Sequence, residues 1–535
     1  MRRREVIAGM LAAVGGSAVG CSEAKPAAGN ASSGSASSGG APTLDDVRSD
    51  AKALGFELSD SELKAIYAYA ADFLKTADRV AKAVPPPPAP KYGPRESTRP
   101  QAADNPLGAW YVTASIKGAP SGPLAGKKIA VKDNVCVAGL PMMNGSKVLE
   151  GFVPSLDATV VTRLLDAGAE ITGKSVCESF CMSFGSHTAD TGFVLNPHDH
   201  TRTTGGSSSG SAALVASNVV DMAVGCDEGG SIRVPSAFCG IVGLKPSWGL
   251  VPFTGIFPLE MTIDHVGPMA HSVHDCALML ETLAGPDGLD PRQHAALQRQ
   301  PYTTLLKAGG KGLRVGILKE GFGLPDGEKD VDALVMDAAH RFERAGAVVS
   351  TVSVPEHTTL AMDCLNLVSA AMSPMARDSM GLGWKGRHQM DMAEFYVKHR
   401  KERAALFPPE VKLWLVMERM LDRASDGLYY GRAQDAALAV RAAYDHALDQ
   451  VDVLVMPTVA ARPPKLPPAN VSFAESMKLS DGAALNTPQF DLTGHPGLNV
   501  PCGKLDGLPI GMMIVGRIGG DATVLRAGYA FEQLG

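Results

Sequence analysis

The sequence lacks both an excess of basic residues and internal repeats, and each absence excludes a class of protein. Its 535 residues carry 50 Lys and Arg against 56 Asp and Glu, a formal charge of −6 that leaves no basic face for phosphates. Nucleic acid is therefore not an expected partner, and we expect a small molecule instead. No repeat with a period of about 20 to 50 residues is present, which excludes solenoids and propellers.

The cysteines and histidines do not form the clusters that bind a metal. No CxxC motif completes a metal site, and His198 and His200 flank Asp199 in a predicted solvated turn. Cys177 and Cys181 are spaced for one helix face. Most cysteines lie in apolar or Gly-rich segments of a chain too large to need disulfides, so we predict buried free thiols and neither a metal nor a cofactor. These thiols are Cys136, Cys177, Cys181, Cys226, Cys239, Cys276, Cys364 and Cys502.

The first twenty residues have the features of an export signal. Arg2, Arg3 and Arg4 precede the apolar residues 6–19, a run too short to cross a bilayer as a stable helix. The sequence around Arg3 and Arg4 resembles a twin-arginine signal. We therefore predict that residues 1–20 direct export, and that the mature protein is periplasmic or anchored to the outer side of the cytoplasmic membrane.

Cys21 is the one candidate for a membrane anchor. Residues 18–21 resemble a lipobox, in which Cys21 would be acylated and become the mature N-terminus. Ala18 stands where a lipobox more often has Leu, so cleavage of a generic signal peptide nearby, without a lipid, stays an alternative.

A tether and a small helical unit follow. Residues 21–42 are rich in Ser, Gly and Ala and cannot bury enough apolar surface to fold, so they predict a flexible tether. Residues 43–90 have helical spacing of apolar side chains, and Ser59 with Glu62 predicts a capping box. The proline run at residues 85–90 ends this helical unit.

Residues 91–535 alternate short β-rich runs with amphipathic segments, which predicts an α/β domain with a mixed, twisted sheet covered by helices. The Met-rich residues 355–445 should be mostly helical, either shaping a substrate pocket or forming a plain helical layer. Strands are predicted at residues 127–133, 169–174, 219–225, 312–318, 347–354 and 451–457, and helices at residues 158–168, 207–217 and 330–347.

Three segments place Lys or Ser where chemistry is possible, although each has an ordinary structural explanation. Lys132 ends the apolar run IAVKDN, where an isolated Lys is usually a solvated strand end. Ser207 follows two glycines at a predicted helix start, which by itself also fits a phosphate-binding loop. Ser231 follows two glycines as well, which by itself fits a turn with an N-cap Ser.

Together the three segments resemble the amidase signature family in content, order and spacing. In that family the Ser of a Gly-Gly-Ser-Ile-Arg segment follows an earlier catalytic Ser by 24 residues, as Ser231 follows Ser207 here. The resemblance covers roughly residues 105–530, and residues 108–118 and 141–170 further resemble the bacterial enantioselective amidases associated with nitrile breakdown. It continues through GKSVCES, NPHD, GLKPSWGLVP, DHVGPMAHSVHD, VDVLVMPT, DLTGHPGLNVPCG and LPIGMMIVGR.

The resemblance implies the amidase signature fold and an amidase that hydrolyses carboxylic amides through a Ser-Ser-Lys acyl-enzyme mechanism. Ser231 would be the nucleophile, and Ser207, after a cis peptide to Gly206, would shuttle its proton to Lys132. No suitable His lies in these segments, so Lys must supply the base. Desolvation in an apolar site lowers the pKa of a Lys, and we therefore expect Lys132 to be neutral.

The resemblance also implies an oxyanion hole and a substrate pocket around the second Ser. The backbone N–H groups of Glu228, Gly229, Gly230 and Ser231 would stabilise the developing oxyanion. In similar enzymes an N-terminal helical unit mediates dimerisation, so a homodimer is a candidate assembly, with packing on the body as the alternative. The candidates for the pocket are Ser208, Asp227, Glu228 and Arg233.

Glu228 departs from the branch that the sequence resembles, in which this position usually carries Gln. In one interpretation Glu228 only pairs with a basic residue such as Arg233. In a second, it faces the acyl pocket as a protonated acid, because an ionised carboxylate would oppose the oxyanion. In a third, it binds a cationic group of the substrate.

Two motifs and two other functions compete with this hypothesis. Residues 206–210 match the nucleophile elbow G-x-S-x-G, but no buried strand precedes them, so Ser208 is not expected to be a nucleophile. Residues 61–64 spell S-x-x-K without the other motifs of a penicillin-binding protein. The glutamine-dependent amidotransferase subunit that releases ammonia from glutamine shares the same core, although its cytoplasmic work conflicts with export. The other competing function is an exported solute-binding lipoprotein, but such a receptor would have no need for the catalytic set of Lys132, Ser207 and Ser231.

Overall fold

The computed structural model describes residues 43–371, 385–468, 471–481 and 485–535, and it divides the chain between Pro86 and Pro87 into two compact units. The predicted signal and tether, with Cys21, lie outside the described residues.

The N-terminal unit is a helical hairpin. Helix α2 (Leu44–Ala53) and helix α3 (Asp60–Ala83) each begin with a capping box, that of α3 formed by Ser59 and Glu62 as the sequence predicts. Ala51 on α2 and Leu63 on α3 are buried, whereas Phe73 on α3 is 73% exposed. The apolar residues that the two helices leave exposed are Leu54, Phe56, Ile66, Tyr67, Tyr69, Phe73, Leu74, Val80 and Val84.

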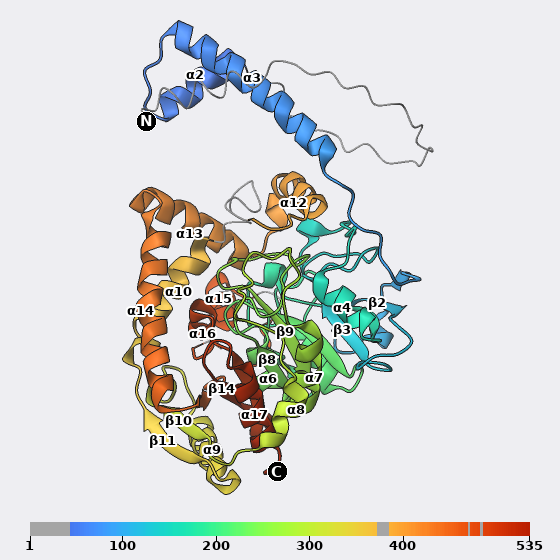
Figure 1. Cartoon of the computed structure of the whole chain (residues 1–535), viewed down its shortest axis with the longest axis vertical. Coiled ribbons are helices and arrows are strands. Elements are labelled where there is room, and N and C mark those ends of the chain that lie inside the picture. The colour runs from blue at the N-terminus through green and yellow to red at the C-terminus, as the bar shows by residue number, and fades with distance from the viewer. Residues whose placement is uncertain (1–42, 372–384, 469–470, 482–484) are drawn as a thin grey trace. The chain divides into compact units, whose positions relative to one another are not determined.

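The second unit is built on one mixed sheet of twelve strands among the described residues, which confirms the α/β fold class (Figure 1). In sheet order the strands are β1 (Ser97–Thr98), β2 (Trp110–Lys117), β4 (Glu170–Ser175), β3 (Lys128–Lys132), β7 (Met222–Asp227), β9 (His265–Ala270), β8 (Val242–Lys245), β13 (Gly497–Leu505), β14 (Leu508–Val515), β12 (Val453–Pro457), β10 (Arg314–Leu318) and β11 (Val348–Val352). A separate hairpin pairs β5 (Leu195–Asn196) with β6 (Asp199–Thr203).

Helices cover both faces of the sheet, and the buried side chains alternate between them. On β7, Met222, Val224 and Cys226 enter one core cluster while Ala223 enters another. Helices α4 (Thr159–Asp166), α7 (Val273–Leu283), α9 (Lys329–Arg341) and α17 (Asp521–Glu532) pack into the first cluster. Helices α5 (Ser209–Ala216) and α6 (Arg233–Cys239) contribute to the second. A short helix α8 (Tyr302–Leu305) follows α7.

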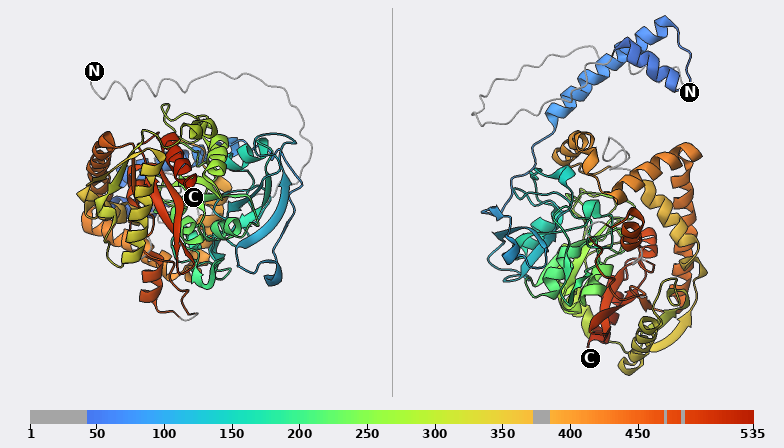
Figure 2. Two further views of the ribbon diagram at one scale, coloured as in Figure 1. Left: turned by 90° about the horizontal axis from the view of Figure 1, so that it is seen from below. Right: turned by 180° about the vertical axis from the view of Figure 1, so that it is seen from behind.

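The Met-rich segment is helical where it is described, as predicted. Helices α10 (Leu360–Ala371), α13 (Pro409–Ser425) and α14 (Leu428–Gln450) lie side by side (Figures 1 and 2). Helix α12 (Met390–Glu402) belongs to the same segment, and two later helices pack against it, α15 (Phe473–Asp481) on α13 and α16 (Gln489–Thr493) on α10 and α14.

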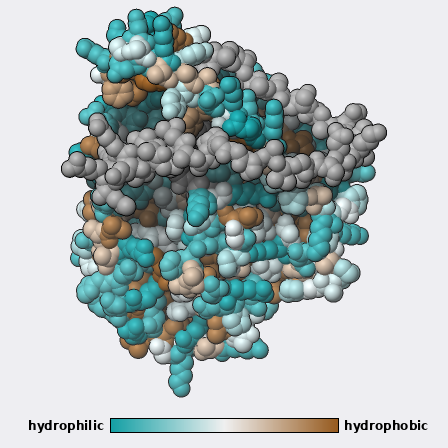
Figure 3. Space-filling model, turned by 45° about the horizontal axis from the view of Figure 1, so that its top comes forward, coloured by the Kyte–Doolittle hydropathy of each residue, from teal (hydrophilic) through white to brown (hydrophobic). Residues whose placement is uncertain are grey.

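On the face that Figure 3 shows, hydrophilic residues predominate and apolar residues lie scattered among them. Within the described ranges, no helix combines the length and the apolar character needed to cross a membrane.

Candidate active site

The site begins at Lys132, the last residue of β3. Strand β3 lies between β4 and β7 and is parallel to both, so its carboxyl end is enclosed and Lys132 is fully buried. Its Nζ donates hydrogen bonds to Ser207 Oγ at 2.8 Å and to the carbonyl of Cys226 at 3.2 Å. Lys132 is therefore not the solvated strand end that its sequence position also allows.

The backbone positions Ser207 directly before helix α5. The Gly206–Ser207 peptide is cis, and the Ser207 carbonyl accepts a hydrogen bond from the N–H of Glu178 at 3.1 Å. A Cβ on Gly206 would lie 2.6 Å from the carbonyl oxygen of Ser183 and 2.8 Å from Cγ of Glu178, so only glycine fits without rearrangement. The close packing holds the Ser207 hydroxyl against Lys132.

Ser231 lies in the turn between β7 and α6, and this turn packs against the segment that carries Ser207 and Ser208. Its carbonyl accepts the N–H of Ser208 at 3.2 Å, which ties the two serine segments together. The structure thus brings Lys132, Ser207 and Ser231 together. Among the hydrogen bonds of the described residues, Ser207 Oγ bonds Lys132, and no bond joins it to the Ser231 hydroxyl.

Only part of the predicted oxyanion hole is available. The N–H of Gly230 donates to Asp227 Oδ1 at 2.5 Å and so is turned inward, which corrects the prediction for that residue. Within the described ranges, no hydrogen bond uses the N–H of Gly229 or Ser231. Thr487 fixes the turn by donating to the Gly229 carbonyl at 2.7 Å. The two free N–H groups are donors for a developing oxyanion.

A buried ionic cluster of Asp227, Arg233 and Asp491 supports this turn. The Arg233 guanidinium contacts Asp227 Oδ1 at 2.9 Å and Asp491 Oδ2 at 2.5 Å, and all three side chains are fully buried. Burial alone would raise the pKa of Asp227, but Arg233 outweighs it and holds that pKa below its usual value. Asp227 also accepts the N–H of Ile232 at 3.0 Å, so the cluster fixes the backbone around Ser231.

Three pocket predictions therefore need correction. The Asp227 carboxylate and the Arg233 guanidinium are fully buried and hydrogen-bonded to each other, so they do not line a pocket. Ser208 Oγ donates to the Cys226 carbonyl at 3.1 Å and joins α5 to β7. Since Arg233 pairs with Asp227 and Asp491, it is not the partner of Glu228 either. Of the four candidates, Glu228 is the one that lies beside the catalytic groups and has no hydrogen bond to its side chain among the described residues.

The charge state of Lys132 also differs from the sequence expectation. Burial by itself lowers the pKa of Lys132, as predicted, but the negative charges of Cys181 and Glu228 outweigh burial and raise that pKa above its usual value. Lys132 is accordingly an ammonium whenever Cys181 and Glu228 are ionised. The sequence could not show this, because those two acids come from different segments.

Cys181 is a neighbour of the site that sequence reasoning missed. The eight cysteines beyond Cys21 are free and buried, as predicted. Cys181, however, follows Phe180 in left-handed backbone, with φ values of 62° and 51°, so it shares no helix face with Cys177. Burial raises the pKa of Cys181, but Cys177, Lys132 and Ser207 together lower it to about 7. Two consecutive left-handed non-glycine residues mark a segment that tertiary contacts hold in place.

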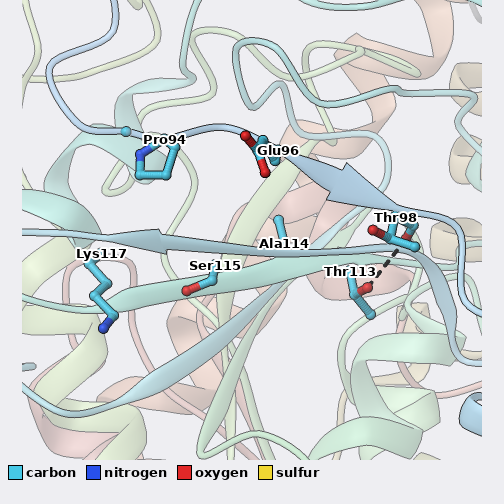
Figure 4. Close-up of a pocket in the computed structure, with 8 residues that line it drawn as sticks. Pro94, Glu96, Thr98, Thr113, Ala114, Ser115 and Lys117 are labelled. Atoms are coloured by element: carbon cyan, nitrogen blue, oxygen red, sulfur yellow. Dashed lines mark hydrogen bonds between the residues drawn. The ribbon is translucent and has the colours of Figure 1, made fainter.

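A surface pocket elsewhere does not belong to this chemistry. It has a volume of about 540 Å³ and lies along the edge strand β1 and its neighbour β2, where Glu96, Thr98, Ser115 and Lys117 line it (Figure 4). None of the catalytic candidates borders it.

Comparison with known families agrees with this geometry. The model of the Amidase family matches residues 106–525, and the chain belongs to that family. It is an enzyme, a hydrolase that acts on amides.

Among individual relatives, the chain is 45% identical to an enantioselective amidase from Rhodococcus rhodochrous, over 88% of this chain and 90% of that protein. It is 38% identical to a glutamyl-tRNA(Gln) amidotransferase subunit from Methanosarcina acetivorans, over 77% and 85% of the two chains. The crystal structure of native peptide amidase from Stenotrophomonas maltophilia matches with a TM-score of 0.62 and 31% identity, over 77% of this chain and 83% of that one.

Proposed function

We propose that this enzyme hydrolyses a carboxylic amide to a carboxylate and ammonia through an acyl-enzyme on Ser231. The observation that carries the proposal is the buried hydrogen bond from Lys132 to Ser207, directly beside Ser231. When Cys181 and Glu228 carry their protons, Lys132 is neutral, and it takes the proton of Ser207 as Ser207 takes that of Ser231. The Ser231 oxygen then bonds to the amide carbon, and the N–H groups of Gly229 and Ser231 stabilise the oxyanion.

The same groups complete the turnover. The relay returns its proton to the leaving nitrogen, the carbon–nitrogen bond breaks, and ammonia departs. Water then loses a proton to the relay and attacks the ester on Ser231, which releases the carboxylate and restores the serine hydroxyl. In each half of the reaction the relay first accepts a proton from the attacking hydroxyl group and then returns a proton to the leaving group.

We expect purified enzyme to release ammonia from simple amides rather than from glutamine. The test is ammonia release from a panel of aliphatic, aromatic and amino-acid amides, with racemic members resolved by chiral chromatography and with glutamine included. The similarity to an enantioselective amidase supports hydrolysis of one enantiomer in preference to the other. Release from glutamine alone would instead favour the amidotransferase-like function, to which the relatives at 38% identity point. Binding of an amide without turnover would favour a solute receptor.

We further propose that the protein is exported through the twin-arginine route and anchored by a lipid on Cys21. Replacing Arg3 and Arg4 by Lys should leave the protein in the cytoplasm, because that route reads the arginine pair and not charge alone. Fractionation with immunoblotting measures this. Cys21→Ala is the control for the anchor, and it should move exported protein from the membrane to the soluble fraction. Unchanged export of the Lys variant would point to the general secretion route.

A homodimer through the N-terminal hairpin completes the proposal. Its support is the apolar surface that α3 leaves exposed, with Phe73 at 73% and Tyr69 at 67%.

A further inference from the structure

We propose that Glu228 acts as a neutral carboxylic acid in the active site, and that its ionisation limits amide hydrolysis at high pH. The inference deepens the proposed function and rests on it, because it concerns the site where Ser231 and Lys132 act.

The first observation is that Glu228 is enclosed without a partner. It follows β7 directly and stands three residues before Ser231. Its side chain is only 4% exposed, and Oε2 has no hydrogen-bond partner. No ion pair within 4 Å reaches it from the described residues. An ionised carboxylate in such a place would have lost most of its hydration without gaining a hydrogen bond or an ion pair.

The second observation is the set of charged and titratable groups around it. Lys132 is the one cation of this set, and its Nζ already donates to Ser207 and to the Cys226 carbonyl. The other groups are thiols and acids that come from three separate parts of the sheet. They are Cys181 from the segment after β4, Cys226 and Asp227 from β7, and Asp264 from the loop before β9.

The neighbouring acids do not stabilise an ionised Glu228. Asp227 is committed to Arg233, and Asp264 accepts the backbone N–H groups of Leu259 and Glu260, each at 3.1 Å. Burial raises the pKa of Glu228 well above its usual value, and Cys181, Asp264 and Asp227 raise it further, whereas Lys132 acts in the opposite direction. Geometry and charge therefore agree that the proton stays on Glu228.

The neutral form suits the chemistry in two ways. An ionised Glu228 would oppose the negative charge that develops on the amide oxygen beside Ser231. It would also hold Lys132 as an ammonium, which has no lone pair to accept the proton of Ser207. Loss of the proton from Glu228 therefore disables the oxyanion site and the base together. Because the active form is the protonated one, activity must fall as pH rises through the pKa of Glu228.

The test is the pH profile of kcat/KM for Glu228→Gln, measured with the neutral amide that the panel shows to be the best substrate. A glutamine amide has nearly the shape of a carboxylic acid and cannot ionise, so the variant should keep at least about one tenth of the activity at neutral pH. Wild-type enzyme should lose about tenfold in kcat/KM for each pH unit above the pKa of Glu228, and the variant should lack this alkaline fall.

Cys181→Ser is both the matched control and the background in which Glu228→Gln is measured, because Cys181 is the other acid beside Lys132 that titrates near neutral pH and its thiolate would also hold Lys132 as an ammonium. The alkaline fall should persist in that variant. Glu228→Asp, which retains a carboxyl group, should also keep the fall and provides a second variant if the Gln form does not fold. An alkaline fall that survives in Glu228→Gln within that background, or one that disappears in Cys181→Ser alone, overturns the proposal.

Two further results are equally decisive. If Glu228→Gln loses only substrates that carry an ammonium group, Glu228 binds a cation and the proposal is wrong. If the wild-type enzyme hydrolyses no amide of the panel, or Ser231→Ala is as active as wild type, the proposed function itself fails, and this is seen at a single pH without any Glu228 variant.

Discussion

Ser231→Ala should abolish amide hydrolysis, with a loss in kcat on the order of 10⁴- to 10⁶-fold, the range seen when an enzyme of this kind loses its nucleophile. The substitution removes one hydroxyl from a residue that is held by its backbone, through the bond from the N–H of Ser208 to the Ser231 carbonyl. The fold and the melting temperature should therefore change little. A fluorophosphonate, which labels activated serines, should no longer attach.

Ser208→Ala is the matched control for that experiment. Ser208 is a buried serine of the same site and occupies the nucleophile position of the motif G-x-S-x-G, yet its hydroxyl donates to the carbonyl of Cys226. The Ser208 variant should still be labelled, and mass spectrometry of the labelled peptide should find the adduct on Ser231. Normal turnover by Ser231→Ala, or an adduct on Ser208, would contradict the mechanism.

The sequence was sufficient to predict the α/β architecture and to select the three residues that the structure brings together. The strands that were found, such as β3, β10 and β12, are uninterrupted apolar runs bounded by polar residues or turns. Strand β9, His265–Ala270, was not predicted, because Gly267 and Pro268 interrupt it. Its six residues are nevertheless all buried, since it pairs with β7 and β8 in the middle of the sheet.

The surroundings of the site could not be predicted, because they depend on contacts between distant segments. Arg233 reaches Asp491, 258 positions away, and Thr487 holds the Gly229 carbonyl from the same distant segment. Local pattern carries no information about such pairs. The same limit explains why Asp227 and Arg233 were placed in the pocket although both lie behind the turn.

The electrostatics of Lys132 show the same limit most clearly. Burial was predicted correctly, but burial is one of two opposing influences on the pKa of this amine. The other is the charge of Cys181 and Glu228, which only the folded chain places beside it. Protonation of those acids leaves desolvation as the remaining influence, and this is the state in which Lys132 can act as a base.

Lys132→Ala should lose kcat/KM by about 10²- to 10⁴-fold, the usual contribution of a general base, because Lys132 is the amine that bonds the Ser207 hydroxyl. Ser207→Ala should lose less, since a water molecule can bridge the gap between Lys132 and Ser231. Steady-state kinetics at a fixed pH compare the two. Equal, small losses in both variants would argue against a relay.

A fully buried side chain also supports the fold, so the loss in Lys132→Ala must be separated from a cavity effect. Lys132→Met keeps the length and volume of the side chain without the amine, and it should be as inactive as the Ala variant while melting closer to wild type. Adding a primary alkylamine to Lys132→Ala supplies a base that fits the vacated space, and it should restore part of the activity in a saturable manner. Lys132→Met has no space for that amine and should not respond. Recovery of activity by Lys132→Met, or an equal response of both variants to the amine, would show that Lys132 acts by packing and not as the base.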